Sequence, residues 1–178
     1  MRHTWLLPAA IAGAFGASAP LVHSIEYASV PAAQKTAFPE ASTFEPFVAG
    51  KELRDAVARK AGRFTVEPRI WRVREGERTI GWFVIDEVVG KQELITYAVA
   101  LDASGAVRSV DVLAYRESHG DAIRLPAWRN QFTGKRESDP LQLDRDIRNI
   151  SGATLSCRHV TEGVHRILVL HADGLARG

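Results

Sequence analysis

Four small residues near the end of the chain, Ser-Gly-Ala-Thr at positions 151–154, are well suited to binding chemistry. Serine is a good residue to cap a helix, and a stretch with helical spacing of apolar residues follows it. The first turn of a helix has unpaired backbone N–H groups and carries the positive end of the helix dipole. Small side chains let an anion come close to these groups, so Ser151, Gly152 and Ala153 predict a possible phosphate site.

Two neighbouring side chains add chemistry to such a site. The hydroxyl of Thr154 can accept a covalent phosphoester. Arg158 follows four positions later, on the same face of the predicted helix, and can neutralise phosphate charge. The plainer alternative is an ordinary capped helix whose small residues pack against a sheet. Taken alone, the four residues favour that plainer alternative.

The surrounding segments predict an α+β fold that would position this helix. Residues 69–89 and 92–117 alternate apolar and polar positions around two turns, which indicates an antiparallel sheet of about four strands. An amphipathic helix is expected within residues 50–62, and a short helix near residues 126–134. The final helix is expected from about Gly152 onward. We therefore expect helices packed on one antiparallel sheet.

The final helix has an apolar stripe that predicts its core face. Its members are Ala153, Cys157, Val160, Val164, Ile167 and His171. On this stripe Cys157 is interpreted as a small buried hydrophobic residue rather than a reactive thiol. His159, His165 and His171 are six residues apart, about 120° on a helix, and so cannot share one face. No metal site is predicted there.

Composition limits the other possible functions. The 178 residues include 46% hydrophobic and 25% charged residues, which is typical of one globular domain. A net charge of +2 with scattered basic residues argues against a nucleic-acid partner. The single cysteine excludes an intramolecular disulfide and a cysteine-based metal cluster. No set of residues at recognisable spacing predicts a hydrolytic active site.

The N-terminus predicts export. A basic start precedes an uncharged apolar run, and Ala17-Ser18-Ala19 resembles a signal-peptidase site, although Pro20 follows it. Residues 1–23 are therefore interpreted as a cleaved signal peptide or an uncleaved N-terminal membrane anchor, with a buried helix as the alternative. Residues 24–48 are expected to form an extended linker segment with a short helix near residues 32–37. Residues 49–178 are expected to form the domain.

Two segments together resemble the FMN-binding domain family, which includes the flavin-carrying subunits of the Rnf and Na+-translocating NADH:quinone oxidoreductase complexes. "ISGATLS" matches the family motif [S/T]-G-A-[T/S] at a helix start. Residues 115–135 are similar to its Glu-x-x-Gly loop and the following Trp…Gln-Phe-x-Gly-Lys segment. Residues 37–47 match more weakly. The resemblance covers roughly Ala37 to the end of the chain.

The resemblance implies FMN as the cofactor, joined to Thr154 by a phosphoester that a flavin transferase forms from FAD. It also implies that Ser151, Gly152 and Ala153 line the phosphate. The family's other motif residues would lie near the flavin: Glu117, His119 and Gly120 in a loop, and Trp128, Gln131 and Phe132 against the ring. The alternatives are a solvated strand end for Glu117 and His119, and core packing for Phe132. Lys135 would face phosphate or a ring oxygen, or lie in a solvated turn.

One position departs from the family pattern. Many flavinylated members have an acidic residue three positions before the motif, where this chain has Arg148, with Asp146 as the nearest acid. Covalent and non-covalent FMN both stay open. We expect a periplasmic or otherwise extracytoplasmic electron carrier, free or anchored to the inner membrane, with a membrane-bound redox partner. The alternatives are a small extracytoplasmic flavin reductase and a non-catalytic exported binding module that has lost the flavin.

Overall fold

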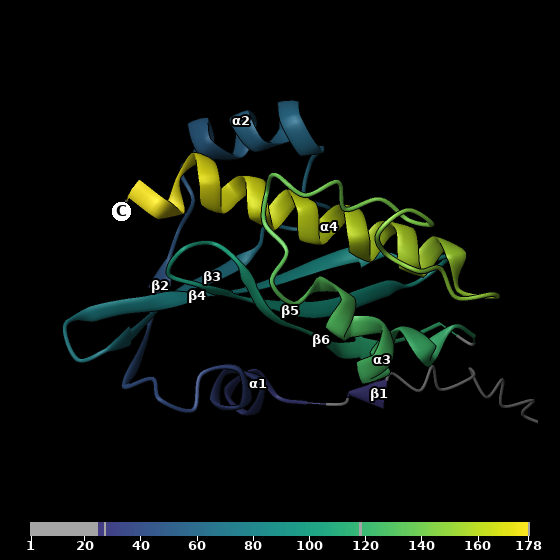
Figure 1. Ribbon diagram of the computed structural model, residues 1–178, viewed down its shortest axis with the longest axis horizontal. Helices are drawn as coiled ribbons and strands as arrows, with labels where there is room; N and C mark the ends of the chain where they lie inside the picture. The colour runs from purple at the N-terminus through teal and green to yellow at the C-terminus, as the bar shows by residue number, and fades with distance from the viewer. Residues whose placement is uncertain (1–24, 27, 118, 178) are drawn as a thin grey trace, which may run out of the picture.

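A computed structural model describes residues 25, 26, 28–117 and 119–177, in which helices cover both faces of one sheet (Figure 1). Within the described residues six strands follow the order β1-β6-β5-β4-β3-β2, and every neighbouring pair is antiparallel. The strands are β1 (Ile25–Glu26), β2 (Thr43–Phe47), β3 (Arg69–Glu75), β4 (Arg78–Val89), β5 (Leu94–Asp102) and β6 (Val107–Tyr115). The expected α+β class with an antiparallel sheet is confirmed.

The helices form layers above and below this sheet in Figure 1. The α-helices are α1 (Val30–Ala37), α2 (Lys51–Ala61), α3 (Pro126–Arg129) and α4 (Thr154–Asp173). Three short 3-10 helices are η1 (Asp121–Arg124), η2 (Asn130–Phe132) and η3 (Leu175–Arg177). Helix α4 crosses one face of the sheet and α2 packs on α4, while α1 lies under the other face. The longest helix is therefore held between α2 and the sheet.

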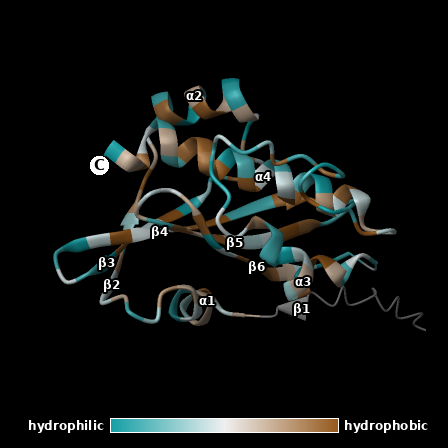
Figure 2. Cartoon of the chain, viewed as in Figure 1, coloured by the Kyte–Doolittle hydropathy of each residue, from teal (hydrophilic) through white to brown (hydrophobic). Residues whose placement is uncertain are grey.

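Apolar residues on both faces of the central strands form two core clusters. Val84 and Val99 belong to the larger cluster, which α4 covers, whereas Phe83 and Ala98 belong to the smaller one on the side of α1. The hydrophobic colour of the central strands in Figure 2 reflects this burial on two sides. Successive strand residues point to opposite faces of the sheet. Both are buried here because helices cover both faces. This sheet is a rigid platform for α4.

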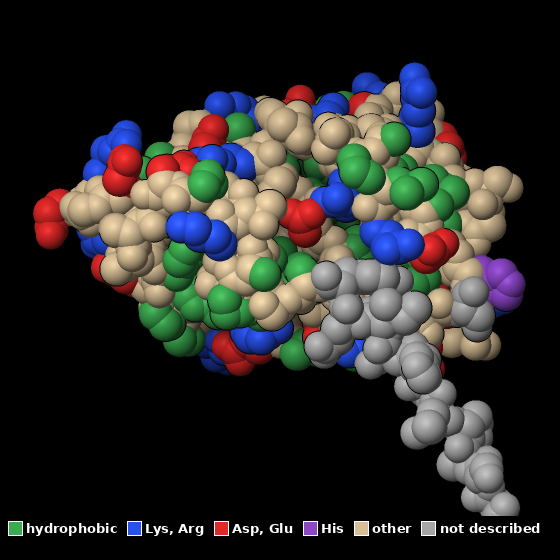
Figure 3. All heavy atoms as spheres, turned by 90° about the horizontal axis from the view of Figure 1, so that it is seen from below, with side chains coloured by type: hydrophobic (Ala, Val, Ile, Leu, Met, Phe, Trp, Pro, Cys, Tyr) green, Lys and Arg blue, Asp and Glu red, His purple; other side chains and the backbone are tan. Residues whose placement is uncertain are grey.

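The face that carries α1 presents charges of both signs. Figure 3 shows basic and acidic side chains dispersed over this face, with hydrophobic side chains between them. Some of these charges are paired: Arg108 donates to Glu40 at 2.6 Å, and Arg129 forms an ion pair with Asp111. The guanidinium of Arg108 also lies 4.4 Å from the centre of the Phe38 ring. The first pair helps to hold the chain after α1 against β6, and the second holds α3 against β6.

The strand count and the linker expectation both need correction. About four strands were expected, but the described residues form five longer strands and the two-residue β1. The segment 24–48, expected to be an extended linker, contains α1 and the edge strand β2, which pairs with β3. Phe44 and Phe47 of β2 pack on opposite clusters, and Pro46 is tolerated because β2 is an edge strand. The short helix expected near residues 32–37 is confirmed as α1.

The expected signal peptide or anchor, residues 1–23, lies outside the described residues. Among the residues that the structure does describe, no helix combines the length and apolar character needed to cross a membrane.

A buried polar cluster lies between the sheet and α4. Tyr97 donates a hydrogen bond of 2.6 Å to Oδ2 of Asp86, and Nη1 of Arg166 lies 3.4 Å from the same oxygen. A Cβ at Gly163 would fall 1.9 Å from the Tyr97 hydroxyl, so a residue without a side chain is required there. Burial raises the pKa of Asp86 to about 6, which the Tyr97 hydrogen bond and the Arg166 charge offset only in part.

The raised pKa of Asp86 predicts a specific pH dependence of stability. Above its ordinary pKa of 3.8 the unfolded chain releases a proton that the folded chain keeps until about pH 6. The contribution of Asp86 to the free energy of unfolding should therefore be greatest at low pH. It should fall by about 3 kcal/mol as pH rises from the ordinary pKa of 3.8 to the folded-state pKa of about 6. Denaturant unfolding of the wild type and Asp86→Asn across this range measures the difference.

Asp55→Asn is the control for this comparison. The hydrogen bond from Lys51 lowers the pKa of Asp55, so the contribution of Asp55 should rise with pH, opposite to that of Asp86. Parallel stability curves for the wild type and Asp86→Asn would contradict the prediction.

Candidate functional site

One end of the sheet brings distant segments around a pocket of about 460 Å³. Because the strands are antiparallel, the turn between β4 and β5 lies at the same end of the sheet as the end of β6. Helix α4 begins at this end too. The residues that line the pocket are Lys91, Gln92, Glu117, His119, Gly152, Ala153, Thr154, Leu155 and Ser156. The pocket therefore brings Glu117 and His119 together with Gly152, Ala153 and Thr154 of the SGAT motif, while Ser151 is not among the lining residues.

The start of α4 differs from the expected one by two residues. Ser151 was expected to cap a helix beginning at about Gly152, but α4 begins at Thr154 with Ala153 as its N-cap. Ser151 is exposed, and Gly152 follows it with φ 82°, a left-handed turn that glycine adopts readily. Within the described residues no side-chain hydrogen bond caps the helix, which leaves the N–H groups of its first turn available to an anion in the pocket.

The hydroxyl of Thr154 lies at the pocket wall and has one side-chain partner among the described residues. Nδ2 of Asn149 donates a hydrogen bond of 3.2 Å to Oγ1 of Thr154. Oδ1 of Asn149 is buried without a hydrogen-bond partner in the described part of the chain. Sequence reasoning missed Asn149, because nothing in the sequence indicates that the chain turns back at Gly152 and places residue 149 beside residue 154.

Glu117 has a structural task inside the pocket. Its Oε1 accepts hydrogen bonds from three successive backbone N–H groups, those of Lys91, of Gln92 at 2.6 Å and of Glu93 at 2.9 Å. Burial raises the pKa of Glu117, but these three N–H donors outweigh burial and leave its pKa below the usual value. The carboxylate thus holds the turn between β4 and β5 in place. It is not the solvated strand end considered as an alternative.

Contacts to α4 hold two loops of the pocket. The hydroxyl of Tyr115, at the end of β6, donates to the carbonyl of His119 at 2.5 Å and lies 3.3 Å from Oγ of Ser156. Nδ1 of His159 lies 2.5 Å from the carbonyl oxygen of Val89, the last residue of β4. The start of α4 is therefore tied to the β6 loop on one side and to the β4–β5 turn on the other.

Gly120 supports the helix start without lining the pocket. Its φ is 91°, and a Cβ at this position would fall 2.7 Å from the Tyr115 hydroxyl and 3.0 Å from Cβ of Ala153. A glycine is required because the loop after β6 packs directly on the residue that precedes α4. Ala153 is itself buried, so this small-to-small contact fixes where the helix begins.

Trp128, Gln131 and Phe132 lie behind the motif rather than at the pocket surface. Phe132 is fully buried and packs edge-on against Trp128 with ring centres 5.1 Å apart, as the core-packing alternative expects. Nε1 of Trp128 donates to the carbonyl of Arg148 at 2.7 Å, and Oε1 of Gln131 accepts from its backbone N–H at 2.8 Å. These residues fix the backbone of the segment that leads into the SGAT motif.

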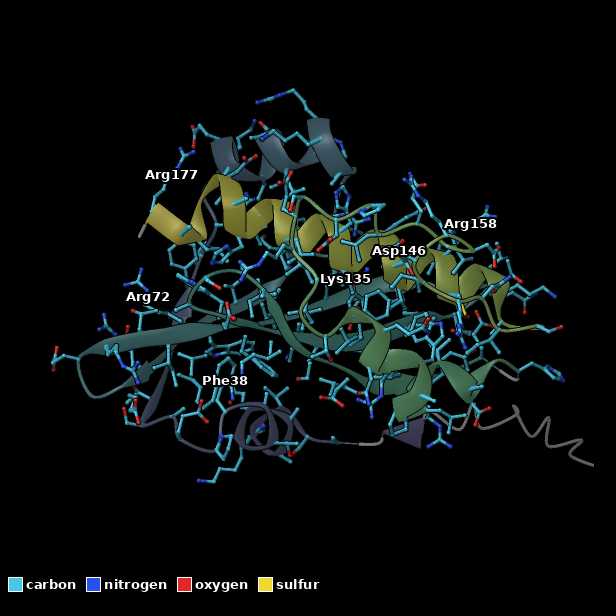
Figure 4. All side chains as sticks on the ribbon, in the orientation of Figure 1. Phe38, Arg72, Lys135, Asp146, Arg158 and Arg177 are labelled. Carbon is cyan, nitrogen blue, oxygen red and sulfur yellow. The ribbon has the colours of Figure 1, made fainter. Side chains whose placement is uncertain are left out.

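Three charged residues near the motif lie outside the pocket lining. Lys135 forms an ion pair of 2.9 Å with Asp146, whose carboxylate also accepts the backbone N–H groups of Leu141 and Gln142 (Figure 4). Lys135 is thus held in a structural ion pair rather than in the expected phosphate contact or solvated turn. Arg158 is exposed on α4, and the side chain of Arg148 is exposed as well.

Among the described residues, no group of three or more His, Cys, Asp or Glu side chains is arranged to hold a metal ion. Cys157, in the first turns of α4, is fully buried, which confirms its interpretation as a core residue. Burial raises the pKa of its thiol, so the thiolate is disfavoured.

The comparison with known families agrees with this geometry. Residues 90–169 match the family model of the FMN-binding domain. This segment, a little under half of the chain, is similar to FMN-binding domains. The matched segment includes every residue that lines the pocket, and the domain indicates FMN as the cofactor. The uncapped start of α4 and the Thr154 hydroxyl suit a ligand that carries a phosphate. No curated protein matches the chain.

The three hydrogen bonds to Glu117 predict how the turn responds to its loss. Glu117→Ala should expose the N–H groups of residues 91–93 and speed their hydrogen exchange by about tenfold or more. Exchange measured by NMR or mass spectrometry tests this. Glu93→Ala, an exposed neighbour in the same turn, is the matched control. Unchanged exchange at all three amides in Glu117→Ala would contradict the assigned role.

Proposed function

We propose that this chain is an extracytoplasmic flavoprotein electron carrier that holds FMN in the pocket at the start of α4, through a phosphoester to Thr154. The observation that carries the proposal is the position of Thr154. It is the first residue of an uncapped helix, and it lines a pocket inside the segment that matches the FMN-binding domain. Bound FMN supplies one- and two-electron chemistry, and the protein holds it and tunes its potential.

The proposed attachment exchanges the phosphoanhydride bond between the two halves of FAD, the donor, for a phosphoester bond to Thr154. Oγ1 of Thr154 forms a bond to the phosphorus of the FMN half of FAD. The bond between this phosphorus and the AMP half breaks with its electron pair, and the hydroxyl proton passes to the released AMP. The N–H groups at the start of α4 favour this place for the phosphate, since they and the helix dipole stabilise negative charge. A separate flavin transferase would catalyse the step.

Asn149 gives Thr154 a partner where the family's usual acid is absent. Arg148 occupies that position with an exposed side chain, and Asp146 is engaged by Lys135. The amide of Asn149 instead holds the Thr154 oxygen at 3.2 Å. We propose that this contact orients the hydroxyl toward the pocket. FMN held without a covalent bond is the alternative that Arg148 favours.

The cellular role is proposed from the N-terminus and the family together. The basic start and apolar run of residues 1–23 resemble an export signal or anchor, so we place the domain in the periplasm or another extracytoplasmic space. A membrane-bound redox partner would exchange electrons with the flavin there. An extracytoplasmic flavin reductase with a soluble acceptor is the alternative in the enzyme class.

Covalent attachment predicts a modified chain that survives denaturation. Co-expression of the exported chain with a flavin transferase should give in-gel flavin fluorescence and a mass increase of FMN minus water. Thr154→Ala should abolish both signals, whereas Thr154→Ser, which keeps a hydroxyl, and the motif control Ser151→Ala should retain them.

An adduct that persists in Thr154→Ala would overturn the assignment of this residue. Yellow native protein without an adduct would point to non-covalent FMN, and colourless protein to a binding module. Turnover of a soluble acceptor without a membrane partner would favour the reductase.

The hydrogen bond from Asn149 predicts a slower attachment when it is lost. Asn149→Ala should reduce the initial rate of adduct formation by about three- to tenfold, because one hydrogen bond that orients the nucleophile is removed. The extent of attachment at long times should match the wild type. Asn130→Ala, an exposed amide in η2, is the control. Equal initial rates in Asn149→Ala and the wild type would rule out an orienting role.

A further inference from the structure

Two residues of the turn between β4 and β5, Lys91 and Gln92, line the pocket. A backbone hydrogen bond of 2.8 Å from Gly90 to Glu93 closes the turn. The next three N–H groups all bind Oε1 of Glu117, so they are not available to a ligand. Lys91 and Gln92 line the pocket with their backbone N–H groups already engaged, which leaves their side chains as the donors that a ligand can use.

Lys91 is the one lysine or arginine among the residues described as lining the pocket. Within the described residues, its ammonium makes no hydrogen bond or ion pair, although the charge of Glu117 lies nearby. The carboxylate of Glu117 is the acidic group among the described lining residues, and three backbone N–H donors hold its Oε1 in the turn and stabilise its charge. Lys91 thus adds a positive charge to a pocket that the start of α4 also makes positive.

We propose that Lys91 binds the phosphate of the flavin nucleotide and makes the pocket select FMN over riboflavin, which lacks the phosphate. The proposal rests on the proposed function in that FMN occupies this pocket. A lysine ammonium is a compact charge on a flexible stem and is a common phosphate ligand, together with backbone N–H groups at a helix start. Lys91 and α4 supply these two kinds of donor to one pocket.

The position of Lys91 depends on Glu117 and Gly90. A Cβ at Gly90 would fall 2.6 Å from Oε1 of Glu117, so the carboxylate can reach the three amides only beside a glycine. The hydrogen bond that His159 of α4 donates to the carbonyl oxygen of Val89 holds the same turn against the helix. Glu117 is accordingly a positioning residue for Lys91, and it reaches the phosphate only through the turn.

Binding of two ligands to the full exported chain separates the phosphate contact from other contributions. The Thr154→Ala background prevents attachment, and titration of flavin fluorescence gives Kd for FMN and for riboflavin. Lys91→Met should weaken FMN binding by about tenfold or more and riboflavin binding by less than about threefold. Lys91→Arg should restore most of the FMN affinity. Lys51→Met, an exposed lysine on α2, is the charge-matched control and should leave both ligands unchanged.

A double-mutant cycle tests the positioning role of Glu117. Glu117→Ala should weaken FMN binding when Lys91 is present and should have a smaller effect in the Lys91→Met background, because the two residues act in series. Additive effects would overturn the positioning role.

Three outcomes would overturn the Lys91 proposal: equal losses of FMN and riboflavin affinity in Lys91→Met, unchanged FMN affinity in that variant, or no FMN binding by the starting chain. None of them bears on attachment at Thr154, which the adduct mass measures separately. Failure of the two proposals can therefore be told apart.

Discussion

The packing of α4 across the antiparallel sheet is the constraint on which the pocket depends. Val160, Val164 and Ile167 are fully buried on this helix, and the polar cluster around Asp86 fixes its middle above β4 and β5. Because α4 is packed along its length, its first residue has a fixed position relative to the sheet. That point lies at the end of the sheet where β4 turns into β5 and where β6 ends, so the pocket results from the register of core packing.

The walls of the pocket are loops, and each loop needs partners for its backbone groups. Beyond the strand ends no neighbouring strand is available to pair with these backbone groups, so side chains provide the hydrogen-bond partners. Glu117 accepts three N–H groups of the β4–β5 turn, and Tyr115 donates to the loop after β6. Trp128 and Gln131 bind both backbone groups of Arg148 before the motif. These contacts keep the loops ordered around the pocket, which lowers the entropic cost of binding a ligand.

Periodicity and turn residues predict much of this fold, and the motifs predict part of the site. The strands around the Glu75–Gly76 and Asp102–Gly105 turns and the apolar stripe of α4 are local patterns, and each was predictable. Strand β2 was missed because its polar and proline-containing sequence forms a strand only at the sheet edge, where Phe44 and Phe47 find the core. Pairing at the edge of a sheet depends on tertiary contacts, so local strand propensity does not predict it.

Site residues that belong to a sequence motif were predictable, whereas residues that reach the site only through the order of the strands were not. Thr154 and Glu117 stand in motifs, whereas Lys91 stands in an unremarkable turn whose importance depends on which strand ends are neighbours. An available signal was the strand order itself: in an antiparallel meander the β4–β5 turn and the end of β6 lie at the same edge. The start of α4 was misplaced because Ser151 is a good cap by residue type, but the turn at Gly152 carries it away from the helix.

The uncapped start of α4 explains why a threonine stands there. A capping side chain stabilises a helix by about 1 kcal/mol, and threonine is a poorer helix former than alanine or leucine. In the described residues α4 has no side-chain cap, and Thr154 occupies its first helical position. Both features make the start of the helix less stable when no ligand is bound. A phosphate bound at that end would satisfy the same N–H groups that a cap satisfies and would offset the helix dipole. Local helix energetics therefore disfavour an uncapped helix that begins with threonine, whereas the anion that we propose would stabilise it. Such a conflict is expected where a helix start serves a ligand rather than stability.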